Sequence, residues 1–201
     1  TAKINVTKNN VSIRGNGNAT ILKRMYDSST GEGVITLNNR SGCKIADLQV
    51  DGNRTSYTSS NNYGIYLGSS SNNTVTGNTC NNNNYGIYLT SSSNNNTVTG
   101  NTCNSNLSYG IYLRTSSGNN TVTGNTCYNN NNYGIYLYSS SNNTVTGNTC
   151  YNNNDTGIYL SSSSNNTLTG NTCNNNDTGI RLYSSSNNTV TGNTCNNNNY
   201  G

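Results

Sequence analysis

The stretch SSSNNTVTGNTC occupies residues 69 to 80 and returns at residues 139 to 150, with near copies around residues 94–103, 118–127, 163–173 and 185–195. Each copy ends in a cysteine, and these cysteines follow one another at spacings of 23, 24, 23, 23 and 22 residues. They are Cys80, Cys103, Cys127, Cys150, Cys173 and Cys195. A repeat of this length indicates a solenoid, in which each unit buries its few apolar residues against its neighbours.

The composition supports a repeat protein and excludes several function classes. Apolar residues make up 29% of the 201 residues and charged residues 8%, with no His, Pro, Trp or Phe. Disordered chains with so few apolar residues are usually highly charged, and this one is not. Most of the Lys and Arg residues lie at or before Arg54, so the repeats lack the basic stripe that nucleic acid requires. No apolar run is long enough for membrane insertion, and without histidine a Ser-His-Asp triad is excluded.

Two short alternating runs recur in each unit, such as residues 64–67 (GIYL) and 74–76 (TVT). Alternation with a period of two predicts strands with one buried face, and the Asn, Ser and Gly clusters between them predict turns. Units of about 23 residues with several strands and no helical period fit the coils of a parallel β-helix. We therefore expect an all-β, single-stranded solenoid of about eight coils of 22–24 residues.

The cysteines are expected to form a ladder inside this solenoid. Leu37 to Val50 and Leu67 to Cys80 are both 13 residues apart, so Val50 should occupy the cysteine position one coil earlier, and Ile21 the coil before that. A position that accepts Val, Ile or Cys is a core position, where a free thiol behaves as a small apolar group. Buried reduced thiols are favoured. Disulfides between coils about 4.8 Å apart and a column of thiols binding Cu(I) are the alternatives, although no His or Met column accompanies the cysteines.

The repeated YGIYL and SSSNNTVTGNT motifs resemble the right-handed parallel β-helix repeat proteins of archaeal (methanogen-type) cell surfaces. Such repeats are grouped with NosD-type periplasmic proteins, which are linked to the maturation of copper enzymes, and with β-helices that bind or cleave carbohydrates. Residues 57–201 carry the resemblance closely. Residues 1–56, with IRGNG at 13–17 and LQVDGN at 48–53, look more like the first coils of pectate-lyase-like β-helices. The resemblance implies a right-handed coil, one continuous domain with an irregular part (1–56) and a regular part (57–201), and an extracellular or cell-surface location.

The six carboxylates give little sign of catalysis. Asp155 and Asp177 occupy the same turn position in adjacent coils, where other coils have Asn. Asp47 and Asp51, expected near Arg54, are the better candidates for a site, although the Asp-Gly-Asn sequence is first of all typical of a turn. We expect no catalytic residue, no metal and no cofactor.

Several regular outward columns are candidate surfaces. Thr-x-Thr pairs form a grid that is compatible with ice binding or simply with the β propensity of Thr; the candidates are Thr74, Thr76, Thr97, Thr99, Thr121, Thr123, Thr144 and Thr146. A tyrosine column either binds sugars or protein or packs between coils; it contains Tyr66, Tyr88, Tyr112, Tyr136 and Tyr159. Asn78 begins an asparagine column that we expect to be structural. Asn-x-Thr glycosylation sites at turns are also frequent; the candidates are Asn72, Asn95, Asn119, Asn142, Asn154, Asn165, Asn176 and Asn187.

These features favour a non-catalytic, structural or adhesive extracellular protein. Ile4 to Val6 has the pattern of the strand that would follow Tyr200 and Gly201, so we expect either head-to-tail self-association into a filament or neighbouring coils of a longer chain. Glycans are possible partners. The first alternative function is a carbohydrate-binding or polysaccharide-cleaving module, and the second is ice binding through the Thr-x-Thr face.

Overall fold

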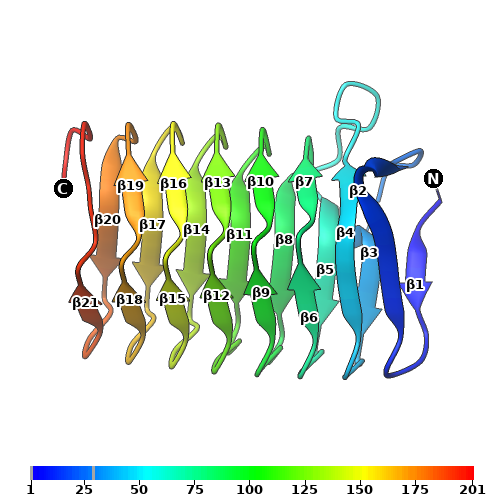
Figure 1. Cartoon of the computed structure of the whole chain (residues 1–201), viewed down its shortest axis with the longest axis horizontal. Helices are drawn as coiled ribbons and strands as arrows, with labels where there is room; N and C mark the ends of the chain where they lie inside the picture. The colour runs from blue at the N-terminus through cyan, green and yellow to red at the C-terminus, as the bar shows by residue number, and fades with distance from the viewer. Residues whose placement is uncertain (1, 29) are drawn as a thin grey trace.

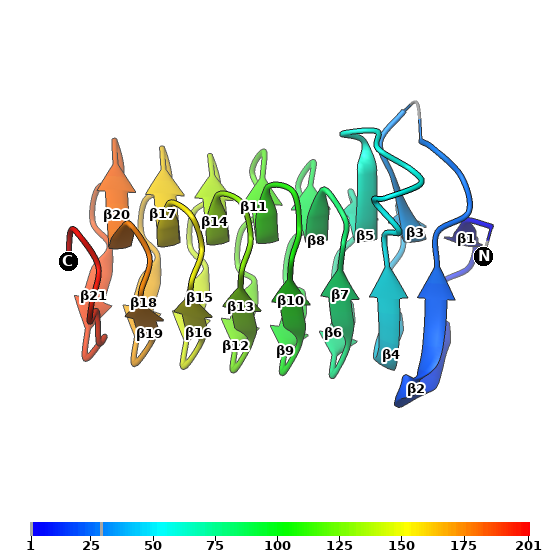
Figure 2. The same cartoon turned by 90° about the horizontal axis from the view of Figure 1, so that it is seen from above.

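The computed structural model describes residues 2–28 and 30–201, which form a β-solenoid without helices (Figure 1). Because these residues contain no helix, none of them belongs to a helix long and apolar enough to cross a membrane. All strand pairs are parallel, and the strands stack in two sheets that run along the long axis (Figure 2). The chain is therefore all-β, as expected from the two-residue period of its apolar positions.

The first sheet takes one strand from each coil. Its members are β1 (Ile4–Val6), β3 (Glu32–Asn38), β5 (Asn62–Gly68), β8 (Tyr85–Thr90), β11 (Tyr109–Arg114), β14 (Tyr133–Tyr138), β17 (Thr156–Ser161) and β20 (Thr178–Tyr183). About seven turns of the solenoid separate β1 from β20. The expected eight coils include the last pass of the chain, through β20 and β21.

The second sheet begins with two long strands, β2 (Ser12–Lys23) and β4 (Lys44–Asp51), and then divides into two arms. The first arm contains β6 (Thr74–Thr76), β9 (Thr97–Thr99), β12 (Thr121–Thr123), β15 (Thr144–Thr146), β18 (Thr167–Thr169) and β21 (Thr189–Thr191). The second arm contains β7 (Thr79–Asn81), β10 (Thr102–Asn104), β13 (Thr126–Tyr128), β16 (Thr149–Tyr151) and β19 (Thr172–Asn174). β4 pairs with both β6 and β7, so one strand spans both arms.

A bend at a left-handed residue separates the two arms. Gly77 has a φ of 64°, and glycine recurs at this position in later coils. In β4 the same position is held by Asp47, which has a φ of 55°. Asp and Gly both tolerate this conformation, because a short polar side chain or none at all avoids the clash that larger side chains suffer.

The predicted core columns are confirmed by the strand register. Ile35 pairs with Ile65, Leu37 with Leu67, and Val50 with Cys80, and these side chains are fully buried. The prediction for Ile21 is wrong. Leu22 pairs with Val50, whereas Ile21 faces outward and is 53% exposed. The cause is two register shifts in β2, between residues 14 and 17 and between residues 17 and 21. The extra residues of these bulges change which of the later side chains face inward.

Asparagine ladders stabilise the corners of every regular coil. In each ladder the backbone N–H and Nδ2 of one asparagine donate to Oδ1 of the next. Nδ2 also donates to a backbone carbonyl, of a core strand in two ladders and of a turn in the third. The predicted ladder contains Asn78, Asn101, Asn125, Asn148, Asn171 and Asn193. Two further ladders were not predicted: Asn73, Asn96, Asn120, Asn143, Asn166 and Asn188, and Asn83, Asn106, Asn130, Asn153, Asn176 and Asn198.

Candidate functional site

The cysteine ladder lies in the core. Five of its members, from Cys80 to Cys173, are fully buried, and Cys195 is partly exposed; all are free thiols. Burial raises the pKa of the Cys103 thiol well above its ordinary value. A hydrogen bond that the Cys127 thiol donates to Cys103, together with burial, raises the pKa of Cys127 in the same way. The thiols thus lie in the core and are kept protonated; their reduced state stays a prediction. Cys43 lies outside this ladder, at the position that Asn73 holds one coil later.

The tyrosine column of Tyr66 to Tyr159 is packed against a second tyrosine column, which was not predicted from the sequence. The second column contains Tyr63, Tyr85, Tyr109 and Tyr133. Within each column the rings stack along the solenoid axis, as for Tyr88 and Tyr112 (5.0 Å, 10°), and between columns they meet edge to face. Neighbouring rings therefore cover most ring faces, and Tyr88 and Tyr112 are buried. This geometry favours packing between coils over a surface on which sugars could stack.

The threonine pairs lie in unbroken register from β6 to β21, with a buried Val or Leu between the two outward side chains in most coils. Ice binding by this face stays a prediction.

Most of the candidate glycosylation sites are exposed turn residues. Asn72, Asn95, Asn119, Asn142, Asn165 and Asn187 occupy one turn position with φ between 55° and 62°. Asn154 is also exposed. Asn176 is not accessible: it is 5% exposed, and its Nδ2 donates to the carbonyl of Cys150 and to Asn198. It belongs to the third asparagine ladder, so its prediction as a glycosylation site is wrong for the folded chain.

The carboxylates are dispersed, and each has a local partner. Glu32 pairs with Lys3, and Asp47 pairs with Arg14 at 2.9 Å. Asp27 accepts hydrogen bonds from the loop of residues 52–61 and from Asn62, which lower its pKa. Asp155 and Asp177 stack at one turn position, as expected, but bond to Thr156 and Asn199 respectively. Among the described residues no group of three or more His, Cys, Asp and Glu side chains is arranged to hold a metal.

Charged side chains line a concave site where β2 and β4 end beside the 52–61 loop. We name it the β2–β4 hollow; it has a volume of about 170 Å³ and is lined by Lys23, Asp51, Asn53, Arg54, Thr55 and Asn82. Its Asp51 lies near Arg54 as predicted, whereas Asp47 faces Arg14 instead. The two carboxylates were expected together, but the bend at residue 47 turns the first one away.

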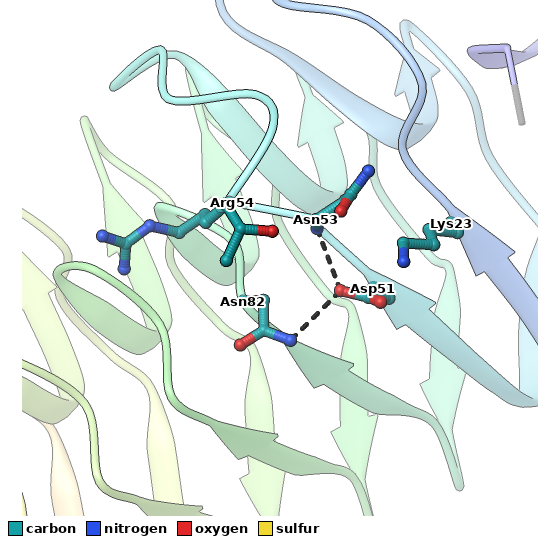
Figure 3. A pocket seen from close by; sticks show the side chains of 6 residues that line it. Lys23, Asp51, Asn53, Arg54 and Asn82 are labelled. Carbon is teal, nitrogen blue, oxygen red and sulfur yellow. Dashed lines mark hydrogen bonds between the residues drawn. The ribbon is translucent and has the colours of Figure 1, made fainter.

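The geometry of the β2–β4 hollow is fixed by Asp51. Its Oδ1 accepts hydrogen bonds from the backbone N–H of Asn53 (2.9 Å) and from Nδ2 of Asn82 (3.1 Å). Figure 3 shows the Lys23 amine directed toward Asp51 and the Arg54 guanidinium extended away from it. Partial burial lowers the pKa of Arg54 from its ordinary value, but the group remains a cation at neutral pH. The hollow thus offers two cations, one carboxylate and neutral amides.

Comparison with known families agrees with this architecture. A family model described as "Right handed beta helix region" matches residues 3–126, which is more than half of the chain. The chain belongs to the right-handed β-helix family. A second model, described as "Periplasmic copper-binding protein (NosD)", matches residues 103–201. The predicted resemblance to NosD-like and pectate-lyase-like β-helices is therefore confirmed. No curated protein matches the sequence.

Solved β-helix structures resemble the chain in fold. The periplasmic alginate epimerase AlgG is 18% identical with a TM-score of 0.60, and the match covers 82% of this chain and 47% of AlgG. The A-module of the Azotobacter vinelandii mannuronan C-5 epimerase AlgE4 is 17% identical with a TM-score of 0.59, covering 94% of this chain and 73% of the module. Pectate lyase Pel9A is 16% identical with a TM-score of 0.64, covering 82% and 45%. The chain thus spans about half of AlgG and of Pel9A. Such identities show a common fold and nothing of the activity.

The thiol ladder of this right-handed β-helix does not fit the copper ion that the NosD description names. Copper(I) prefers thiolate or thioether sulfur, and the thiolate is the metal-binding form of cysteine. Here burial and thiol–thiol hydrogen bonds favour the protonated thiols, as at Cys103 and Cys127. The ladder is also closely packed, since a Cβ built at Gly134 would lie 3.0 Å from Sγ of Cys150. The Cys150 thiol is thus in close contact with the backbone at Gly134.

Proposed function

We propose that this right-handed β-helix is a non-catalytic structural or adhesive protein that works outside the cytoplasm, at the cell surface. The proposal rests on one observation: the polar side chains of the solenoid bond mainly to other groups of the same chain. All six carboxylates are engaged in hydrogen bonds or ion pairs within the solenoid, and many of the asparagines that dominate the composition hydrogen-bond to one another inside it. Hydrolytic enzymes of sugars pair two carboxylates in one concave site, whereas the β2–β4 hollow is lined by a single carboxylate, Asp51, which accepts hydrogen bonds from Asn53 and Asn82.

The location proposed here rests on similarity. The NosD family model is described as periplasmic, and so is AlgG. A buried, protonated thiol ladder is chemically inert and does not depend on the redox state of the compartment. This makes the core compatible with an oxidising extracellular environment.

A turnover assay tests the non-catalytic role. Alginate and pectate are suitable probes, because the structural neighbours include alginate epimerases and a pectate lyase. The purified chain should release no product and change no uronate stereochemistry, measured by chromatography of chain length and by NMR of the polymer. Turnover that disappears in Asp51→Asn would show that the protein is an enzyme with its active site in the β2–β4 hollow.

A second candidate is supported by the β2–β4 hollow itself: binding of an acidic polysaccharide without cleavage. Lys23 and Arg54 supply cations and Asn82 an amide, which are groups that hold sugar carboxylates and hydroxyls. Calorimetry with alginate oligosaccharides should then give an affinity that falls in Lys23→Gln and Arg54→Gln and weakens with added salt. The matched control is Lys8→Gln, since Lys8 is exposed and does not line the hollow. Equal loss in the control would indicate nonspecific charge attraction only.

Head-to-tail stacking is not required by the proposal. Ile4 and Val6 already pair with Ile35 and Leu37 of the first sheet. In a head-to-tail stack, the first coil of a second copy would lie against the last coil of the first copy. In that first coil Gly17 pairs with Leu48, which in turn lies opposite Asn78, so Gly17 holds the place of the asparagine ladder. A glycine supplies no Oδ1 acceptor, so Asn193, the last member of the Asn78 ladder, would find no ladder partner in a second copy. The proposed role therefore does not depend on a filament.

A further inference from the structure

The turn between the first sheet and the first arm of the second sheet changes length along the solenoid. Leu113 and Val122 are nine residues apart, whereas Leu137 and Val145, one coil later, are eight apart. The longer turn has two successive residues at positive φ, Thr115 (54°) and Ser116 (59°). The shorter turn has only Ser139 (49°) at the equivalent place. The extra residue creates a step between the two coils.

A hollow of about 270 Å³ lies at this step. We name it the Ser116–Ser139 hollow, and its lining residues are Asn94, Ser116, Gly118, Asn119, Ser139, Ser141 and Asn142. All of them are asparagine, serine or glycine, so the hollow has no charged side chain and no apolar side chain. Oδ1 of Asn94 accepts from the backbone of Gly118, and Oγ of Ser141 accepts from the backbone of Ser164. The side chains of Ser116, Ser139, Asn119 and Asn142 form no hydrogen bond among the residues that the structure describes, so their polar atoms remain available to a ligand.

The chemistry of the Ser116–Ser139 hollow suits a neutral, polyhydroxylated molecule such as a sugar. Hydroxyls and amides both donate and accept hydrogen bonds. However, sugar and ligand sites that bind free molecules well also have apolar or aromatic walls, which this hollow lacks. A free sugar would be held weakly here. A sugar that is covalently attached at the rim would not have that weakness, because tethering replaces the cost of association with a high effective concentration.

Both acceptors for such an attachment line the Ser116–Ser139 hollow. Asn119-Asn120-Thr121 and Asn142-Asn143-Thr144 are Asn-x-Thr sequences, and both asparagines are exposed. They belong to adjacent coils, which lie about 4.8 Å apart. N-linked sugars are bulky, so one hollow can receive the sugar of only one of the two asparagines at a time.

We propose that the Ser116–Ser139 hollow seats the first sugar of an N-linked glycan, carried by either Asn119 or Asn142 but not by both. The inference rests on the location outside the cytoplasm that is proposed above. In the attachment, the anomeric carbon of a lipid-diphosphate-linked oligosaccharide bonds to the asparagine Nδ2. That nitrogen loses one proton, and the lipid diphosphate leaves. The hydroxyls of Ser116 and Ser139 then hydrogen-bond to the attached sugar.

Occupancy is the first test. The chain is secreted from a eukaryotic host that glycosylates Asn-x-Thr sites, and glycopeptides are mapped by mass spectrometry after cleavage at Tyr128, which separates the two sites. Intact-mass analysis of a variant in which every other Asn-x-Thr or Asn-x-Ser site is removed should give one glycan per chain, shared between Asn119 and Asn142. Thr144→Val, which removes only the second site, should raise occupancy of Asn119 to about that total. Chains with two glycans, or secreted chains with none at either site, would overturn the proposal.

A thermodynamic cycle tests the seat itself. Ser116→Gly and Ser139→Gly remove the hydroxyls without strain, because both residues have positive φ and glycine tolerates it. Enzymatic removal of the glycan should lower the urea midpoint of the wild type and leave that of the double glycine variant unchanged. An equal change in both proteins would mean that the sugar does not use the hollow. None of these outcomes depends on turnover or polysaccharide binding, so the proposed function stands or falls separately.

Discussion

Asn101 donates both its backbone N–H (2.9 Å) and its Nδ2 (3.0 Å) to the Oδ1 of Asn125, one coil further along the axis. Asn125 repeats the same pair of bonds to Asn148, and its Nδ2 also reaches the carbonyl of Val98. Each asparagine thus satisfies backbone groups at a bend where strand pairing is interrupted. Buried backbone groups without a partner are costly. The asparagine content of this chain is therefore a structural requirement of its bends.

Asn125→Ala should be among the more damaging substitutions in the chain. It leaves the N–H of Asn101 and the carbonyl of Val98 without their partner in a buried corner. With each orphaned group costing about 1 to 3 kcal/mol, the free energy of unfolding should fall by roughly 2 to 6 kcal/mol. Urea unfolding followed by circular dichroism measures the change.

The matched control is Asn129→Gly. Asn129 is exposed and has a φ of 54°, which glycine adopts freely, so we expect a change within about 0.5 kcal/mol. Similar losses at both positions would show that asparagine acts through the backbone conformation of turns and not through the ladder.

Cys127 should tolerate an apolar replacement better than a polar one. Val50 already occupies the same column, so Cys127→Val places a side chain of a type that the core accepts. Volume-conserving apolar changes usually cost less than about 1.5 kcal/mol. Cys127→Ser introduces a hydroxyl into a fully buried position and should cost about 1 to 3 kcal/mol. Chemical denaturation under reducing conditions compares the two, and greater tolerance of serine would contradict a thiol ladder in the core.

Stability should fall at alkaline pH. The pKa values of Cys103, Cys127 and Cys150 are raised well above the ordinary value in the folded chain, and that of Tyr133 is raised to about 12. The folded state therefore keeps protons that the unfolded state releases above about pH 8.5 for cysteine and about pH 10 for tyrosine. The stabilisation is complete below those values and is lost progressively as pH rises above them.

Urea midpoints measured from pH 7 to pH 11 test this dependence. The midpoint should be level up to about pH 8 and then decline. In a variant with Cys103→Val and Cys127→Val the decline should be shallower, because two of the titrating groups are gone. A wild-type midpoint that stays constant to pH 11 would be inconsistent with buried thiols and phenols.

The repeat spacing predicted the solenoid and its core columns because each column is a run of identical residues at one offset. Cys80 and Cys103 pair as their spacing requires, and Val50 was placed correctly from its distance to Leu37. The same arithmetic failed at Ile21, because the bulge in β2 leaves no mark in the sequence other than its glycines. Counting is reliable only where coils have the same length.

The sites were less predictable than the fold. The second tyrosine column could have been found, because Tyr85 and Tyr109 recur three residues before Tyr88 and Tyr112. The burial of Asn176 was hidden because the same Asn-x-Thr letters describe an exposed turn and a ladder position. The two hollows depend on how loops of unequal length meet, as at Ser116 and Ser139. Sequence distance alone does not give that relationship.

The tyrosine columns should stabilise the fold whether or not they bind anything. The Tyr112 ring lies within 5.2 Å of the ring centroids of Tyr85, Tyr88, Tyr109 and Tyr136. Tyr112→Ala removes all four contacts from a residue that is 6% exposed. Aromatic-to-alanine changes in cores cost about 3 to 5 kcal/mol, so we expect a loss near the lower end of that range for a column on the outer face.

Tyr112→Phe keeps the ring and should cost far less. Tyr183→Ala, at a residue that is 58% exposed, is the control, and its effect should be below about 1 kcal/mol. If Tyr112→Ala and Tyr183→Ala prove equally mild in thermal unfolding, the columns are not packing elements, and a binding role for Tyr66 to Tyr159 regains support.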